Sequence, residues 1–174
     1  MVKYYLGIDP GKDGAFAVLD ENYKIIETVV MPTIGNKRVY DKQGIREILF
    51  KYPYEYIVIE KPSNMYGYSK SAVESLAHCV GLLEGMVFVM GTAHTTVAPQ
   101  KWQGVAWGDT VRQFKPKNDA GKKDRDPKAT TLLACINFYP THEFRQMGVR
   151  GLLKHRHDGV MDAVLIARYG IATF

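Results

Sequence analysis

Short apolar runs and longer segments of helical period alternate along this chain. Three of the runs come first, at residues 4–9 (YYLGID), 14–20 (GAFAVLD) and 24–31 (KIIETVVM), with the turn-forming segments PGKD and ENY between them. Strands joined by such short turns pair with their neighbours, so the pattern predicts a three-stranded antiparallel meander. Two further strands are predicted at 56–62 (YIVIEKP) and 94–99 (HTTVAP). The first of these is apolar on both faces, as in a sheet covered on both sides.

Helical spacing of apolar residues predicts the elements that cover this sheet. These are 41–52, with Asp41 as a possible N-cap, 69–90, a short helix after Pro99, 126–140, and 157–171. Residues 108–126 are polar and basic, which predicts a mobile loop. Since no repeat or linker divides the chain, we expect one α/β domain over residues 1–174.

Charge is distributed unevenly along the chain. Residues 1–98 hold 10 Lys and Arg against 11 Asp and Glu, whereas residues 99–174 hold 13 against 7. A basic half is typical of proteins that bind a polyanion, although many basic proteins bind no nucleic acid.

The remaining composition indicates a cytosolic protein. The longest apolar stretch, 80–91, is short and contains Glu84, so we expect no membrane span, and the N-terminus shows no secretory signal. Cys79 and Cys135 are isolated within apolar helical patterns and are expected to be reduced core residues.

Four carboxylates stand where strands and the last helix are expected to meet. Asp9 and Glu60 end two predicted strands, and Asp158 and Asp162 lie four residues apart at the start of the last helix. If the two strands are neighbours, these side chains reach one crevice at the carboxyl ends of the strands. Carboxylates so close repel one another unless they take up protons or hold divalent cations, and oxygen ligands without thiolates suit Mg²⁺ or Mn²⁺.

Each acid also has an ordinary structural explanation. Asp9 is a common residue at the start of a turn, Glu60 at a strand end is commonly solvated, and Asp158 is suited to cap the last helix. Asp162 resists such an explanation best, because the stripe that it shares with Ile166 should face the core. A buried carboxylate without a partner costs several kcal/mol or becomes protonated.

The segments LGIDPGKDGAFAVL (6–19), YIVIEKP (56–62) and HDGVMDAVLIA (157–167) together resemble RuvC-type Holliday junction resolvases of the ribonuclease H-like superfamily. The likeness is to the compact RuvC-like proteins of phages and bacteria, and it runs in order over nearly the whole chain. It implies a ribonuclease H-like α/β fold, in which a mixed five-stranded sheet of a meander plus two parallel strands is flanked by helices. It also implies a homodimeric, Mg²⁺-dependent endonuclease that nicks opposing strands of a four-way DNA junction, in the cytoplasm of a bacterium or a phage-infected host.

The matching segments identify the acids that would bind metal in such an enzyme. They are Asp9, Glu60, Asp158 and Asp162, with a pair of Mg²⁺ or Mn²⁺ ions expected in the active site and 5′-phosphate and 3′-hydroxyl products. Two features depart from the family pattern. Many RuvC proteins space the last two acids by three, whereas Gly159 and a spacing of four are found here, and Ser63 replaces an aromatic wedge three residues after the glutamate. The nearest aromatic substitutes are Tyr66 and Tyr68.

Other residues are candidates for catalytic support or DNA contact. Lys154, His155 and His157 could orient a water or offset phosphate charge, or they could be solvated residues at a helix start. The candidates for DNA contact carry a positive charge or an aromatic ring: Lys61, Tyr66, Tyr68, Arg112, Lys115, Lys117, Lys122, Lys123, Arg125 and Lys128. For these, a solvated loop and aromatics packed on the domain are the alternatives.

Two pairs of residues in the helical segments have a packing role in this interpretation. Trp102 and Trp107 are expected to pack beneath the basic loop. Gly81 and Gly85 on the long helix permit close approach, either of a partner helix in a two-fold dimer or of the helix to its own sheet.

The acids alone do not select the substrate. Cleavage of RNA in hybrids, cleavage of other branched DNA, and a non-catalytic junction-binding module are alternative hypotheses. An actin-like or sugar-kinase-like ATPase is excluded, because it needs two such domains and a second phosphate loop. Retained carboxylates disfavour the non-catalytic module, since negative charges facing phosphates weaken DNA binding.

Overall fold

The chain folds around a five-stranded sheet with the strand order β3-β2-β1-β6-β7. The computed structural model describes all residues except 1, 63–64, 66, 117–122 and 149–150, and of residues 146–148 and 151–154 it describes only the backbone. The strands are β1 Tyr4–Asp9, β2 Ala15–Asp20, β3 Ile25–Val30, β6 Tyr54–Glu60 and β7 His94–Val97. The first three form an antiparallel meander, and β6 runs parallel to both β1 and β7. The predicted mixed sheet is therefore confirmed.

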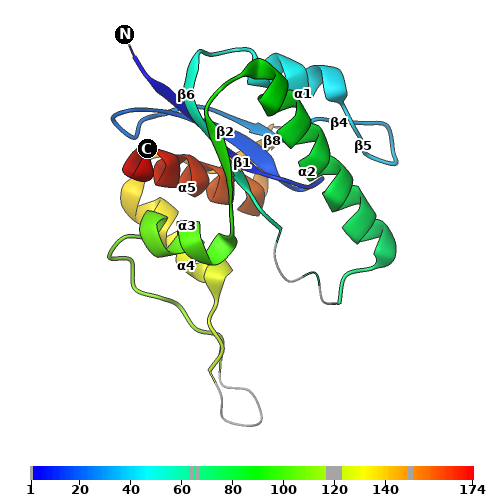
Figure 1. Cartoon of the computed structure of the whole chain (residues 1–174). Coiled ribbons are helices and arrows are strands. Elements are labelled where there is room, and N and C mark those ends of the chain that lie inside the picture. The colour runs from blue at the N-terminus through cyan, green and yellow to red at the C-terminus, as the bar shows by residue number, and fades with distance from the viewer. Residues whose placement is uncertain (1, 63–64, 66, 117–122, 149–150) are drawn as a thin grey trace.

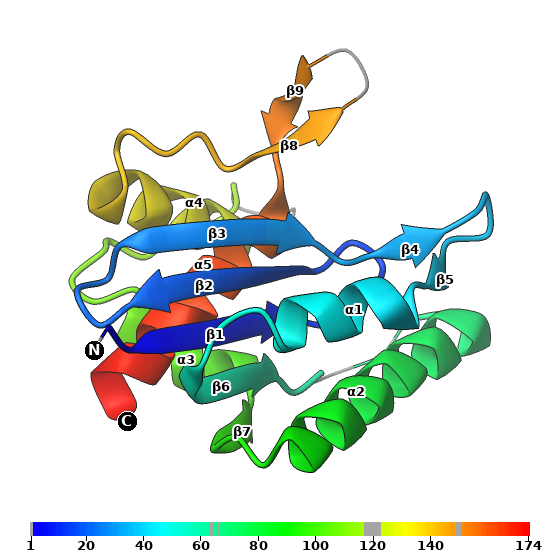
Figure 2. The same ribbon diagram turned by 90° about the horizontal axis from the view of Figure 1, so that it is seen from above.

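Helices cover both faces of this sheet (Figure 1, Figure 2). On one side lie α1 Lys42–Leu49 and α2 Lys70–Met90, and on the other lie α3 Pro99–Ala106, α4 Pro127–Phe138 and α5 Asp158–Thr173. Successive residues of a strand point to opposite faces. Ile57 and Ile59 accordingly pack with α1 and α2, whereas Val58 between them packs with α5. This double covering explains why the β6 sequence has no polar face.

Side chains at the helix starts fix where the helices begin. Asp41 accepts a hydrogen bond from the Gly44 amide at 3.1 Å, which confirms it as the N-cap of α1. The N-cap of α5 is His157, whose ring nitrogen Nδ1 accepts from the Val160 amide at 3.3 Å. The capping explanation for Asp158 is therefore wrong, because that acid is the first residue inside the helix.

Two short hairpins were not predicted from the sequence. They consist of β4 Thr33–Ile34 with β5 Val39–Tyr40, and β8 Arg145–Gly148 with β9 Gly151–Arg156. Both are too short or too polar to show the alternation that marks a half-buried strand. The second projects beside α4 (Figure 2). In the 108–126 loop, an isolated bridge between Phe114 and Arg125 closes the base.

The long helix α2 buries one face and exposes the other. Cys79, Leu83 and Val87 are fully buried against the sheet, while the Phe88 and Val89 side chains are 77% and 81% exposed. By length and composition, α2 could cross a membrane, although helices that cover a sheet in a soluble core pass the same test. Cys79 and Cys135 are free and buried, as expected.

Gly81 and Gly85 lie on the exposed side of α2. A Cβ atom at either position would meet nothing within 4 Å. Close packing of α2 on its own sheet is therefore not the role of these glycines.

Candidate active site

The sheet and α5 bring the four predicted acids to one edge of the molecule. Ile8 of β1 and Ile59 of β6 are register partners, and each is followed directly by an acid, Asp9 or Glu60. The two strands are neighbours, so both acids stand at the carboxyl edge of the sheet, where ligands of α/β proteins gather.

Glycines allow α5 to approach this edge closely. A Cβ on Gly7 of β1 would overlap the backbone of Ala163 and Ala167, so α5 lies directly on that strand. A Cβ on Gly159 would overlap the backbone of the β1–β2 turn and lie 3.0 Å from an oxygen of Asp9. The absence of side chains at these positions therefore brings the first turn of α5 against Asp9.

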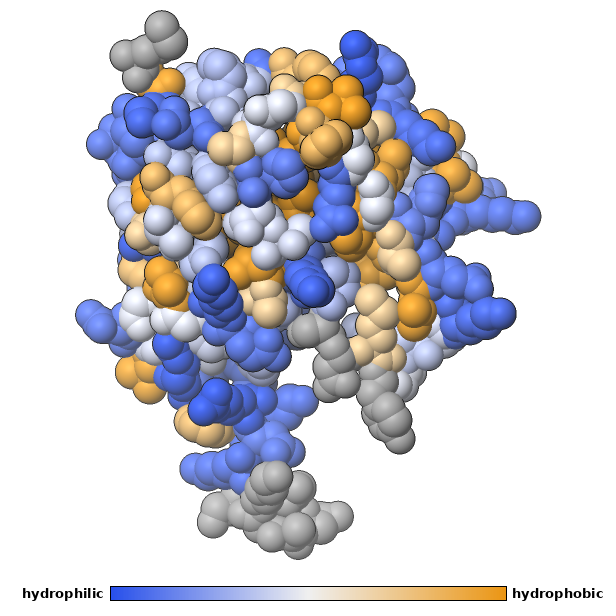
Figure 3. All heavy atoms as spheres, in the orientation of Figure 1, coloured by the Kyte–Doolittle hydropathy of each residue, from blue (hydrophilic) through white to orange (hydrophobic). Residues whose placement is uncertain are grey.

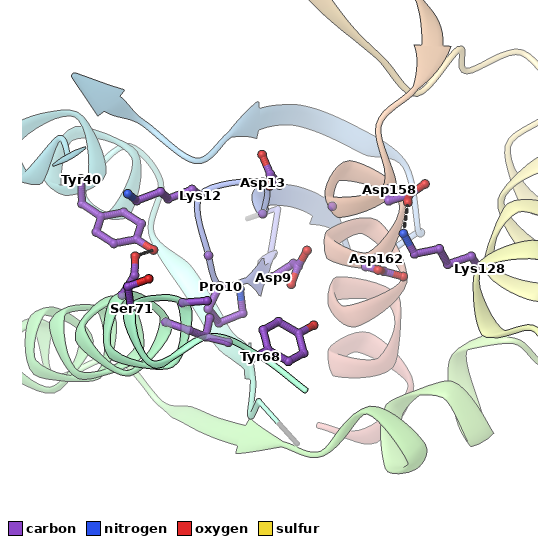
Figure 4. Close-up of a pocket in the computed structure, with 16 residues that line it drawn as sticks. Asp9, Pro10, Lys12, Asp13, Tyr40, Tyr68, Ser71, Lys128, Asp158 and Asp162 are labelled. Carbon is purple, nitrogen blue, oxygen red and sulfur yellow. Dashed lines mark hydrogen bonds and ion pairs between the residues drawn. The ribbon is translucent and has the colours of Figure 1, made fainter. Parts of the chain in front are cut away.

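The acids line two adjoining hollows that share Asp9, the larger of which is drawn in Figure 4. The larger has a volume of about 610 Å³ and is lined by Asp9, Asp158 and Asp162, among others. The smaller, of about 170 Å³, is lined by Asp9 and Glu60. Tyr68 lines both hollows. All four acids thus line adjoining hollows at one edge of the sheet.

Burial raises the pKa values of Asp9, Glu60 and Asp162, and the charges of neighbouring acids add to this for Asp9 and Asp162. The pKa of Asp9 is raised well above its usual range by burial and then by the charges of Asp162 and Glu60. Burial, followed by the charge of Glu60, raises the pKa of Asp162 to about 7. The pKa of Glu60 is also raised by burial. The protein thus holds negative charges together against their repulsion, an arrangement common at functional sites.

Two buried tryptophans orient two of the acids. The Trp102 indole N–H donates to Glu60 Oε2 at 2.6 Å, which partly offsets the rise in the Glu60 pKa. The Trp107 indole N–H donates to Thr131 Oγ1 at 3.2 Å, and a hydrogen bond from Thr131 lowers the pKa of Asp162. Sequence reasoning assigned both tryptophans to packing and missed these bonds. A tryptophan in an amphipathic helix gives no signal that separates the two roles.

Asp158 differs from the other acids because it is exposed and paired. Lys128 Nζ of α4 lies 2.7 Å from Asp158 Oδ2 (Figure 4). The pKa of Lys128 is raised, first by this hydrogen bond and charge and further by Asp162. An ammonium group therefore stands at the mouth of the hollow, next to two of the carboxylates.

The candidate supporting residues occupy different positions. His157 caps α5, and burial lowers its pKa, so that its capping nitrogen stays unprotonated. His155 is exposed and lines a neighbouring groove rather than the acid hollow. The side chain of Lys154 lies outside the described part of the structure.

The candidate DNA-contact residues differ in exposure and in position, and of those described, Tyr68 and Lys128 line the acid hollow. Tyr68 is 61% exposed, so the alternative that it packs on the domain is wrong. Arg112 is partly buried, with its guanidinium carbon 4.7 Å from the centre of the Trp107 ring. The other described candidates are exposed: Lys61, Lys115, Lys123, Arg125 and Lys128. Tyr66, Lys117 and Lys122 lie outside the described residues. Figure 3 shows the projecting loop that carries several of these residues as a hydrophilic surface.

The donor set fits a hard divalent cation in its chemistry. Carboxylate oxygens are the preferred ligands of Mg²⁺ and Mn²⁺, and a cation would offset the burial and the mutual repulsion that raise the Asp9 and Asp162 pKa values. Within the described part of the chain, no three Asp, Glu, His or Cys side chains are drawn together into a coordination shell. A bound ion would therefore have to pull these carboxylates inward.

Comparison with known proteins identifies the fold. Neither a protein-family model nor a curated protein sequence matches the chain. Among solved structures, it is similar to T. thermophilus RuvC in complex with Holliday junction substrate, with 14% identity, a TM-score of 0.62, and coverage of 96% of this chain and 92% of that one. A second Thermus thermophilus RuvC structure gives 15% identity, a TM-score of 0.58, and coverage of 97% and 92%. The chain therefore has the RuvC fold, with its mixed five-stranded sheet between two layers of helices.

Proposed function

We propose that this protein is a structure-selective DNA endonuclease that resolves four-way junctions by paired, metal-dependent nicks. One observation carries the proposal. Four carboxylates from β1, β6 and α5 line adjoining hollows at the same edge of a RuvC-like sheet. Binding of a polyanion does not need such a cluster, because carboxylates repel phosphates. Cleavage assisted by divalent cations does.

The four acids have unequal roles in this proposal. Asp9, Glu60, Asp158 and Asp162 would hold the divalent ions, which supply a Lewis acid for the scissile phosphate and lower the pKa of an attacking water. Asp9 is central, since it lines both hollows. Glu60 is held in place by the Trp102 indole.

Lys128 contributes positive charge at the same place. Its ammonium group lies 2.7 Å from Asp158 and at the mouth of the acid hollow. It can bind a phosphate that enters the site and offset the negative charge that develops on the phosphoryl oxygens. Tyr68, which is exposed over both hollows, can stack on an unpaired base at the branch point.

A homodimer completes the proposal, because paired nicks need two active sites. A groove of about 390 Å³ runs between α1 and α2, and Phe50, Gly81, Gly85 and Val89 are among the residues that line it. The exposed apolar face of α2 continues from this groove. A second copy related by a two-fold axis would cover this surface and match the symmetry of a four-way junction.

The proposal is tested with labelled synthetic substrates. A four-way junction, a linear duplex, a flap and an RNA–DNA hybrid are each incubated with the protein in Mg²⁺ or in chelator. We expect symmetric nicks in the junction alone, in Mg²⁺ alone, with 5′-phosphate ends. Asp162→Asn should abolish cutting while junction binding persists.

A matched control lies on β6. Glu60→Gln should abolish cutting, whereas Glu55→Gln removes an exposed acid at the other end of that strand and should leave cutting unchanged. Equal cutting of the hybrid would favour a ribonuclease. Junction binding without cutting in any divalent metal would favour the non-catalytic module, and full activity of Asp162→Asn would rule out the acid site.

A further inference from the structure

A second groove begins where the acid hollow ends. It has a volume of about 660 Å³ and lies between α4 and the base of the β8–β9 hairpin. Lys128 and Asp158 line both this groove and the acid hollow, so the two spaces adjoin at this ion pair. A DNA strand that lay in the groove would therefore pass next to the acid hollow.

The walls of the groove are basic and its floor is apolar. The basic residues come from three separate segments: Lys115, Lys128, Arg145, His155 and Arg156. Two acids line it as well, but Asp126 caps α4 and Asp158 pairs with Lys128. Apolar atoms of the floor come from Ala129, Leu132 and Met161. Basic walls over an apolar floor suit a sugar–phosphate backbone, whose phosphates need cations and whose sugars do not.

Two arginines in the wall face each other across the hairpin. Arg145 of β8 and Arg156 of β9 are direct register partners. Like charges placed directly opposite each other in a β-ladder are destabilising. The only ion pair of Arg145 within the described residues is a long one, 3.7 Å to exposed Glu143, and Arg156 has none there. Among the described residues, Glu143 at 3.7 Å is thus the one anion that pairs with either arginine of this register pair.

The base of the hairpin is anchored, which keeps this arginine pair in position. Phe144, just before β8, is 2% exposed and lies in the core beside the rings of Tyr139 and His142. Its carbonyl oxygen accepts from the His157 amide at 2.8 Å, which ties β8 to the start of α5. The same residue that caps α5 thus links the arginine pair to the acid-bearing helix.

We propose that this groove holds the backbone of one DNA strand beside the scissile phosphate, with Arg145 and Arg156 sharing a single phosphate. The inference rests on the proposed function and adds the path of the strand. One bound phosphate would accept hydrogen bonds from both guanidinium groups and relieve their repulsion. Lys115 and Lys128 would then contact phosphates on either side of the shared one.

Binding of a labelled four-way junction in chelator tests the inference without depending on cleavage. The variants are Arg145→Gln, Arg156→Gln and the double variant. Lys24→Gln/Lys42→Gln, which removes two exposed charges on β3's leading turn and α1, is the control. We expect affinity about tenfold weaker in each single variant and weaker still in the double, in keeping with charge-assisted hydrogen bonds. The slope of log affinity against log salt should fall by about 0.9 in the double variant alone, because one phosphate contact is lost only when both arginines are gone.

Two further measurements separate DNA contact from a structural role. A neutral methylphosphonate is moved one position at a time along a junction strand. It should weaken wild-type binding at one position near the branch, and at that position it should not change the affinity of the double variant. Thermal unfolding of the double variant should occur at or above the wild-type temperature, because the repulsion has been removed.

Each outcome decides the inference. Unchanged affinity and salt slope in the double variant, an unchanged methylphosphonate pattern, or a lower unfolding temperature would overturn it. If the wild type fails to cut junctions in Mg²⁺ but the arginine-dependent binding is found, the groove stands and the proposed endonuclease function falls. If the wild type cuts junctions and the arginine substitutions have no effect on binding, the proposed endonuclease function stands and the groove inference falls.

Discussion

The replacement of Asp162 by asparagine should stabilise the metal-free protein as the pH rises. Asp162 lies among other acids, with a pKa of about 7 instead of the ordinary 3.8, mainly through burial and the charge of Glu60. This difference corresponds to about 4 kcal/mol, since one pKa unit is worth about 1.4 kcal/mol. Asparagine has nearly the same shape and carries no charge at any pH.

The sign follows from which state binds the proton more tightly. The folded pKa of Asp162 lies above that of the unfolded chain, so the folded state holds a proton that the unfolded state releases. The resulting stability is fully present below about pH 4 and is lost as the pH rises through about 7. Wild-type stability should therefore fall relative to Asp162→Asn by about 3 kcal/mol between pH 5 and pH 8.

Urea unfolding in chelator at several pH values measures this difference, with Glu55→Gln as an exposed control. The pH profile of Glu55→Gln should follow the wild type. Addition of Mg²⁺ at pH 8 should then stabilise the wild type and have little effect on Asp162→Asn, because a ligand of the folded state adds to its stability. Parallel pH profiles of the wild type and Asp162→Asn would refute the crowded-acid reasoning. A pH effect without any Mg²⁺ effect would refute the metal site but would leave the crowded-acid reasoning intact.

Three other substitutions test how the site is built. Trp102→Phe replaces the indole with a smaller aromatic ring that cannot donate the 2.6 Å hydrogen bond to Glu60. Single-turnover cleavage should slow by about tenfold with junction affinity unchanged, and an unchanged rate would show that the indole bond does not position Glu60. Gly159→Ala should lower both the unfolding temperature and the cleavage rate, because the new methyl overlaps the β1–β2 turn, whereas Gly104→Ala, with open space around it, should do neither. Gly85→Gln should stabilise the α2 helix by about 0.5–1 kcal/mol, but its side chain would fill the proposed dimer surface. Sedimentation should therefore shift from dimer to monomer, and paired nicks in a plasmid cruciform should become single nicks. A dimer that persists would place the interface elsewhere.

Local sequence pattern was enough to predict the framework of this protein. The meander, β6 and the helices were predictable because their side chains follow the period of the element that they form. Asp9 and Glu60 were recognisable because each ends an apolar strand. Asp162 was recognisable because it interrupts an apolar stripe on α5.

The short hairpins and the tryptophan bonds were beyond such reasoning. The strands of the β8–β9 hairpin, RQMG and GLLKHR, do not alternate between apolar and polar residues, so their sequences carry no periodic signal. The bond from Trp102 to Glu60 joins residues 42 positions apart in the chain. Nothing near either residue indicates that they meet.

The sequence by itself thus determined which residues could form strands, helices and an acidic edge. Only the tertiary structure decided which of them meet. Gly7 and Gly159 let α5 lie against β1, where burial raises the pKa values of Asp9 and Asp162 and the charge of Asp162 raises that of Asp9 further. The physical reason is that secondary structure depends on neighbours within a few residues, whereas burial and charge repulsion depend on distances in space between segments far apart in the chain.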